Sequence, residues 1–121
     1  MSGNRQKTGK DGEQKALSYL IKKNYQIIET NLRHQKCEID IIASKNKELV
    51  FFEVKTRTNS IISQENLISI AQQKRIIYAA DYYINKNKID LYIRFDLIYV
   101  EKDLKSFKFT HFKEIFIPTI D

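Results

Sequence analysis

The stretch ELVFFEVKTR, residues 48–57, decides the fold of this chain because it carries charges inside its most apolar run. Side chains alternate between the two faces of a strand, so Glu53 and Lys55 share one face while Phe52 and Val54 share the other. An apolar interior penalises a charge that has no partner. We therefore expect a core strand in which another group meets these two charges.

The segments around this strand predict a mixed α/β domain. CEIDIIAS, residues 37–44, lies across a short polar turn from it, so the two strands form a hairpin. Helices are predicted over 11–23 and 70–84, with caps near Thr8 and Ser69, and strands over 25–34, running out at Asn31, over 91–101 and over 106–112. The order α-β-β-β-α-β-β, with hairpin strands apolar on both faces, indicates a three-layer mixed sheet flanked by helices.

Length and composition favour one globular domain over residues 1–121, with a flexible segment at 1–8. Of the 121 residues, 42% are hydrophobic and 12% aromatic, which is enough for a core, and no low-complexity linker divides them. Charges interrupt the apolar runs before the roughly 18 residues of a membrane span. No apolar segment follows the basic N-terminus, as one does in a secretory signal. We expect a cytoplasmic protein with no membrane partner.

The charged residues favour a polyanionic partner and exclude a zinc site. Lysine and arginine number 21 against 15 aspartate and glutamate, giving a net charge of +6, which suits nucleic acid. The single Cys37 and the two histidines, His34 and His111, do not form a zinc-type ligand cluster. Any metal in this protein is therefore expected to be bound by oxygen.

Asp40, on the first hairpin strand, is the expected partner of the buried charges. If the turn is Asn46-Lys47, Asp40 stands directly across from Glu53, whereas a turn shifted by one residue places the two acids on opposite faces. Like charges on directly opposed strand positions destabilise a sheet. The first register therefore predicts that a cation lies between the two carboxylates.

Metal-assisted hydrolysis of a phosphodiester would use this arrangement. Asp40, Glu53 and the backbone carbonyl of Val54 can hold Mg²⁺ or Mn²⁺, which polarises a phosphate and lowers the pKa of a bound water. Lys55 can orient that water or neutralise charge that develops on the phosphate. Glu13 lies on the apolar stripe of the first helix, so it points inward and can support the metal through a water.

Each of these residues also has a purely structural interpretation. The pattern E-x-K is common in lysine-rich sequence, and Glu53 and Lys55 can pair with each other or with Arg57 on a partly exposed strand. Basic residues around the proposed site either contact phosphates or are simply solvated; they are Arg33, Lys36, Arg57, Lys74 and Arg75. Arg94 and Asp96 are interpreted as a structural pair, and packing is favoured over base stacking for Tyr78, Tyr82 and Tyr83.

Several motifs resemble those of the YraN family of uncharacterised bacterial proteins. GKDGEQKALSYLIKKNYQIIETNLR resembles the opening helix and first strand of the family, and EIDII resembles its E-I-D-L-I. LVFFEVKTR, QQKRIIYAADYYI and RFDLIYV are similar to its V-F-V-E-V-K-x-R, its second helix and its R-F-D-V-V strand. Cys37 replaces a glycine usual before E-I-D, and Asn24 replaces another before Tyr25, where it can adopt a left-handed helix cap.

The resemblance implies a fold like that of PD-(D/E)xK restriction endonucleases and Holliday-junction resolvases. Carried across residue by residue, it implies Glu13, Asp40, Glu53 and Lys55 as a catalytic quartet.

Three functions stay open: an Mg²⁺-dependent endonuclease acting on branched or flapped DNA, a nucleic-acid-binding module that keeps the nuclease fold without turnover, and a structural interaction protein. A homodimer is conceivable from the fold alone.

Overall fold

The computed structural model describes the backbone of residues 2–58 and 67–118 and the side chains of residues 10–58 and 67–118. Within these ranges the elements follow the predicted order α-β-β-β-α-β-β. They are α1 (Ser2–Lys22), β1 (Gln26–His34), β2 (Cys37–Lys45), β3 (Glu48–Thr58), α2 (Ile70–Lys86), β4 (Tyr92–Lys102) and β5 (Phe107–Phe112). None of the helices in these ranges is long and apolar enough to cross a membrane.

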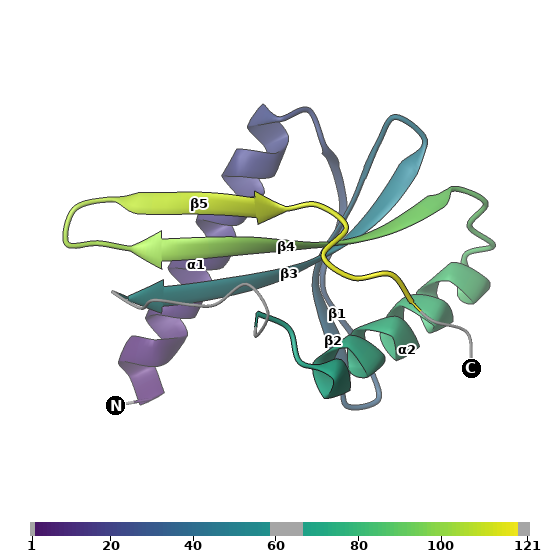
Figure 1. The fold of residues 1–121 in the computed structure, drawn as a ribbon, viewed down its shortest axis with the longest axis horizontal. Coiled ribbons are helices and arrows are strands. Elements are labelled where there is room, and N and C mark those ends of the chain that lie inside the picture. The colour runs from purple at the N-terminus through teal and green to yellow at the C-terminus, as the bar shows by residue number, and fades with distance from the viewer. Residues whose placement is uncertain (1, 59–66, 119–121) are drawn as a thin grey trace.

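The strands form one mixed sheet in the order β1-β2-β3-β4-β5. Every neighbouring pair is antiparallel except β3 and β4, which run parallel and are joined by a crossover that contains α2. Figure 1 shows α1 passing behind β3, β4 and β5, whereas α2 lies beside β1 and β2. The two helices thus cover different parts of a single sheet.

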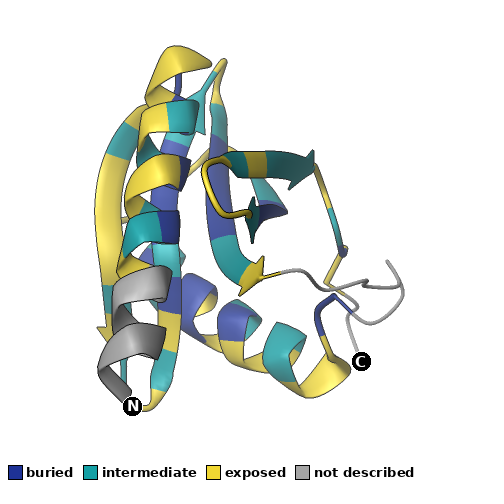
Figure 2. Ribbon diagram, turned by 90° about the vertical axis from the view of Figure 1, so that its left-hand side faces the viewer, coloured by how far each residue is buried: buried dark blue, intermediate teal, exposed yellow. Residues whose placement is uncertain are grey.

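Two apolar clusters lie on the two faces of the sheet. Ala16 and Leu20 of α1 pack against Phe52 and its neighbours, and Ile76 of α2 packs against Phe51. Figure 2 shows that α1 buries the side that faces the strands and exposes the other. The predicted three-layer architecture is confirmed, because each hairpin strand contributes buried residues to both clusters.

The turn between β2 and β3 has the predicted register. Asn46 and Lys47 both have positive φ, 52° and 66°, as a two-residue type I′ hairpin turn requires. Lys45 pairs with Glu48, and the ladder continues to Ile41 and Phe52. The next pair along the hairpin in this register is Asp40 with Glu53.

Two element boundaries differ from the sequence prediction. α1 begins at Ser2 rather than near Asp11, because the polar residues before Asp11 carry no apolar stripe by which their helix could be recognised. β1 does not run out at Asn31 but continues to His34. Asn31 adopts a φ of 54°, which asparagine tolerates better than most residues, and the strand pairs with β2 on both sides of it. Asn24 has a φ of 70°, which agrees with its predicted role as a helix cap.

Arg94 and Asp96 form the structural pair that the sequence predicts, inside a larger buried network. Asp96 accepts from Arg94 Nε and Nη2 at 2.9 and 2.8 Å, from the backbone N–H of Glu114 at 2.9 Å, and is 2.7 Å from His111 Nε2. Burial alone would raise the pKa of Asp96, but these hydrogen bonds outweigh it and hold that pKa below its usual range. The network ties β4 to β5 within the layer that contacts α1.

Gly12 sets how closely α1 approaches β3. A Cβ built at this position would lie 1.9 Å from Thr56 Oγ1 and 3.0 Å from Thr56 Cβ, so any side chain would force the helix and the strand apart. Glu13 follows directly, and its position over the sheet depends on this close contact. The glycine is therefore explained by packing rather than by backbone conformation.

We expect Gly12→Ala to destabilise the protein by roughly 1–3 kcal/mol, the usual cost of overpacking, although alanine is the better helix former. Chemical denaturation measures the loss. Thr56→Ala removes the clashing atoms, so the double variant should recover most of the stability that Gly12→Ala loses. Equal losses in the two backgrounds would show that the contact with Thr56 does not determine the residue at this position.

Candidate functional site

The predicted acids meet where the β2–β3 ladder ends. Beyond the pair of Ile41 and Phe52, the N–H of Val54 donates to Asp40 Oδ2 at 2.8 Å instead of to a backbone carbonyl. Ile39 and Ile41 belong to apolar clusters on different faces, although side chains two apart on a strand normally share a face. The alternation of β2 thus breaks at Asp40, whose carboxylate turns toward β3.

Asp40 and Glu53 lie close enough to perturb each other's ionisation, as the register predicts. Burial raises the pKa of Asp40 to about 6 and that of Glu53 to about 8, and the negative charge of Asp40 adds to the second shift. The interaction between the two side chains lowers the pKa of Asp40 and raises that of Glu53, which favours Glu53 as the acid that keeps its proton. The two acids therefore hold about one proton between them at neutral pH.

Gln72 of α2 joins Glu53 to Lys55. Its Nε2 donates to Glu53 Oε1 at 3.2 Å, and its Oε1 accepts from Lys55 Nζ at 3.1 Å. Lys55 also donates to the backbone carbonyl of Leu67, and burial lowers the pKa of its ammonium group. The sequence identified Gln72 only as part of a helix cap, and its backbone N–H does donate to Ser69 Oγ at 3.1 Å. The start of α2 therefore positions an amide between the acid and the lysine.

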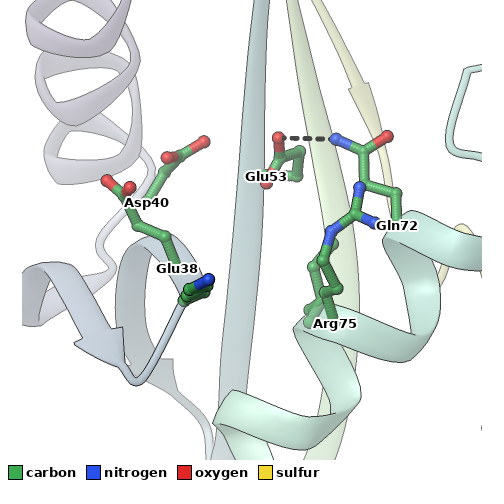
Figure 3. Close-up of a pocket in the computed structure, with 7 residues that line it drawn as sticks. Glu38, Asp40, Glu53, Gln72 and Arg75 are labelled. Atoms are coloured by element: carbon green, nitrogen blue, oxygen red, sulfur yellow. Dashed lines mark hydrogen bonds between the residues drawn. The ribbon is translucent and has the colours of Figure 1, made fainter.

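An open cleft of about 230 Å³ gives access to the acids. In Figure 3, Glu38 and Asp40 form one wall, Gln72 and Arg75 the other, and Glu53 lies between them. The lining residues come from the turn between β1 and β2, from β2, from β3 and from α2; they are Lys36, Glu38, Asp40, Glu53, Gln72, Arg75 and Ile76. A negatively charged floor with cations at its edge is suited to hold a metal ion under a phosphate.

Glu13 is half-buried and lies close to the acids without lining the cleft. Its charge raises the pKa of Asp40, and burial raises its own pKa, although a hydrogen bond to Asn31 works in the opposite direction. Asn31 lies across from Asp40, between the paired positions on either side of it. The helix thus places a third carboxylate beside the pair and beside the left-handed Asn31.

The basic residues predicted to contact phosphates divide into two groups. Lys36 and Arg75 line the cleft. Arg33, Arg57 and Lys74 are exposed and lie outside its lining, and Arg57 donates to the carbonyl of its neighbour Thr56.

Sequence reasoning missed Glu38, Ile76 and the bridging role of Gln72. A partial signal for Glu38 was available, because it is an acid two residues before Asp40 on the same strand; the break in alternation at Asp40 nevertheless means that spacing alone does not fix how the two side chains lie. The position of Gln72 beside Glu53 depends instead on how the crossover helix docks, which no local pattern reports.

The acids fit a divalent metal in ligand type and in charge. Mg²⁺ and Mn²⁺ prefer oxygen donors, which the two carboxylates supply. Metal ligands bind in their deprotonated form, so a bound cation would replace the proton that the two acids share. N–H donors from Val54 and Gln72 orient one oxygen of each carboxylate. The described ranges contain no group of three or more His, Cys, Asp or Glu side chains arranged to hold a metal, so the expected site needs the Val54 carbonyl and solvent as well.

Comparison with known proteins places the chain in a family. A model of the uncharacterised protein family UPF0102 matches residues 12–100. The chain belongs to the UPF0102 (YraN) family. A UPF0102 protein of Flavobacterium psychrophilum is 44% identical over 109 residues, which cover 89% of this chain and 92% of that protein. UPF0102 proteins of Bacteroides thetaiotaomicron and Clostridium perfringens are 41% and 40% identical, covering 93% and 81% of this chain and 93% and 82% of their own lengths.

The UPF0102 match confirms the family that the sequence motifs indicate. Its matched segment contains Glu13, Asp40, Glu53 and Lys55, together with the bridging Gln72. The description of the family states no activity, so any function for this site has to be argued from its geometry.

Proposed function

We propose that this chain is a metal-dependent endonuclease that hydrolyses phosphodiester bonds in DNA. The observation that carries the proposal is the pair of buried acids Asp40 and Glu53, which two neighbouring strands bring together on the floor of an open cleft. A structural role gives no reason to bury two carboxyl groups against each other, because they repel when both are ionised and avoid that repulsion only by keeping a proton. A site that accepts a divalent cation gives such a reason.

The chain supplies groups for each part of the reaction. Asp40, Glu53 and the Val54 carbonyl would hold Mg²⁺ or Mn²⁺, which would supply Lewis acidity toward a phosphate and would lower the pKa of a water. Lys55 offers an ammonium group that can neutralise charge at the phosphate once its contact with Gln72 is exchanged for one with substrate. Arg75 and Lys36 stand at the edge of the cleft, where they can hold the strand on either side of the scissile bond.

The topology also supports this function. The acids lie on a hairpin of a mixed sheet, with a helix on each face and a parallel crossover after the hairpin. This is the arrangement that the resemblance to PD-(D/E)xK nucleases and Holliday-junction resolvases implies, so branched or flapped DNA is the proposed substrate class.

A second candidate is a nucleic-acid-binding module that keeps the nuclease fold without turnover. One observation favours it: Lys55 is tied to the Leu67 carbonyl and to Gln72 and does not line the cleft. Such a protein would bind DNA through the same basic edge but would not cleave it.

The deciding experiment is a cleavage assay with purified protein on linear, flapped and four-way DNA. Mg²⁺, Mn²⁺ and a chelator form the metal arms. The endonuclease proposal expects cleavage only with metal. Binding of all three substrates without cleavage in any metal arm would leave the binding module as the function.

We expect DNA binding to weaken steeply as salt rises, because Lys36 and Arg75 would act by neutralising phosphates. Fluorescence anisotropy at several salt concentrations, in chelator, gives the slope of log K against log salt. Arg75→Ala should reduce that slope by about one and weaken binding similarly for unrelated sequences. Lys88→Ala removes the same charge from the exposed turn after α2 and should leave the slope almost unchanged. A slope near zero in the wild type would show that Lys36 and Arg75 do not neutralise phosphates when DNA binds.

A further inference from the structure

The last residue of β1 forms an aromatic group with α2, next to residues that line the cleft. The imidazole of His34 stacks on Tyr82, with ring centroids 3.7 Å apart and planes 7° from parallel. Tyr78 stacks on the same imidazole at 5.4 Å and 28°. We call His34, Tyr78 and Tyr82 the aromatic step. None of its members belongs to the buried core.

The aromatic step lies next to the cleft on two elements, α2 and the end of β1. Arg75, which lines the cleft, precedes Tyr78 by three residues on α2, so the two side chains lie on neighbouring turns of one helix face. Lys36, which also lines the cleft, follows Gln35, whose Oε1 accepts from the Tyr78 hydroxyl at 3.4 Å. A strand whose phosphates contact Arg75 and Lys36 would thus lie next to the aromatic step.

Tyr78 presents the surface on which a base could lie. Its side chain is 48% exposed, although it is one of the larger apolar groups of the protein. Its stacking on His34 and its contact with Gln35 hold the ring in place, so little conformational freedom would be lost when a ligand binds. A fixed, exposed aromatic ring next to cations is the usual platform for unpaired bases, which stack without regard to sequence.

We infer that the aromatic step binds an unpaired base beside the cleft, so that the substrate carries a single-stranded segment next to the bond to be cut. The inference rests on the proposed function for the identity of the cleft and adds the class of DNA. A blunt duplex keeps its bases stacked in the helix and cannot offer one to Tyr78. Flapped DNA, or a single strand, can.

Binding measurements in chelator test the inference without any cleavage. The probes are a fluorescent oligothymidylate, a blunt duplex of equal length and a duplex with a single-stranded flap. Tyr78→Ala should weaken binding of the single strand and the flap about tenfold, as loss of one base stack would, and change duplex binding less than about twofold. Tyr78→Phe keeps the ring and should bind like the wild type.

Tyr92→Ala is the matched control. Tyr92 is an exposed tyrosine on β4, paired with Glu48 and therefore five residues along the sheet from Glu53. Tyr92→Ala should leave the affinities for the single strand, the flap and the blunt duplex unchanged. A thermal melt of each variant shows whether its fold is intact.

A second readout reports stacking directly. An oligonucleotide that contains 2-aminopurine loses fluorescence when that base stacks, and the chain has no tryptophan to interfere. Wild type and Tyr78→Phe should quench it more than Tyr78→Ala. Equal quenching by all three, or a Tyr78→Ala loss of equal size on the blunt duplex, would overturn the inference. Because these assays contain no metal, they can support base binding even if the protein never cleaves DNA. Cleavage of blunt duplex with no preference for single-stranded segments would contradict the base-binding inference but would leave the proposed endonuclease function standing.

Discussion

Asp40→Asn and Glu53→Gln should each lower metal-dependent DNA cleavage by at least about 100-fold while leaving the fold intact. Each change keeps the shape of a side chain and its hydrogen bond from Val54 or Gln72, but removes a negative charge from the proposed metal site. Removing a residue that only hydrogen-bonds to a metal ligand typically lowers metal affinity or activity 10- to 100-fold. Removing the charge of one of two carboxylate ligands is expected to lower activity at least as much. Cleavage rates with saturating DNA across a range of Mg²⁺ concentrations measure the effect.

DNA affinity should stay equal or increase in the same variants, because less negative charge faces the phosphates. Asp90→Asn removes an identical charge from an exposed position outside the cleft and should cleave like the wild type. Lys55→Ala should lower turnover while still allowing metal to bind. If Asp40→Asn and Glu53→Gln cleave as fast as Asp90→Asn, the two acids do not hold the metal.

Without metal, the free energy of unfolding should fall as pH rises from about 5 to about 8.5. The folded pKa values, about 6 for Asp40 and about 8 for Glu53, lie above the ordinary values of 3.8 and 4.5. The folded state therefore binds more protons than the unfolded state in this window, and its stability decreases as those protons are lost. With 1.36 kcal/mol per pKa unit, and about 1 unit from Asp40 and 3 units from Glu53 within this window, the decrease is about 5 kcal/mol.

Urea denaturation of wild type and Glu53→Gln across this pH range isolates the contribution of the pair, because the two proteins share every other titrating group. The variant should show the smaller decrease and should be the more stable protein at pH 8.5. Mg²⁺ should stabilise the wild type at that pH by about 2.7 kcal/mol at 100 times its Kd, and the variant by far less. A variant that is less stable than the wild type at every pH, with no response to metal in either protein, would instead identify the acids as structural partners.

The sequence predicted the hairpin and its register because both depend on local chemistry. Asn46 and Lys47 form a two-residue turn with positive φ at both positions, and this turn sets Asp40 against Glu53. The cap at Ser69 is equally local. Apolar periodicity found the part of α1 that packs on the sheet but not its polar beginning, since periodicity reports only buried faces.

The rest of the site depends on contacts between elements that are distant in the sequence. Gln72 reaches Glu53, and His34 reaches Tyr82, only after α2 has docked against β1 and β2. The turn of Asp40 toward β3 follows from the local break in strand alternation beside Asn31, and no apolar pattern in the sequence marks that break. Sequence therefore indicated which acids meet but not what surrounds them.

The parallel pairing of β3 with β4 bears on the order in which the molecule assembles. The hairpin of β2 and β3 closes across two residues, whereas β3 and β4 pair across all the residues between Thr58 and Tyr92, and longer closures are slower. We therefore expect Asp40 and Glu53 to meet first in water, where both are ionised at neutral pH. Packing of α2 would then bury them and draw a proton from the buffer, so we expect the late step of folding to be also a step of proton uptake.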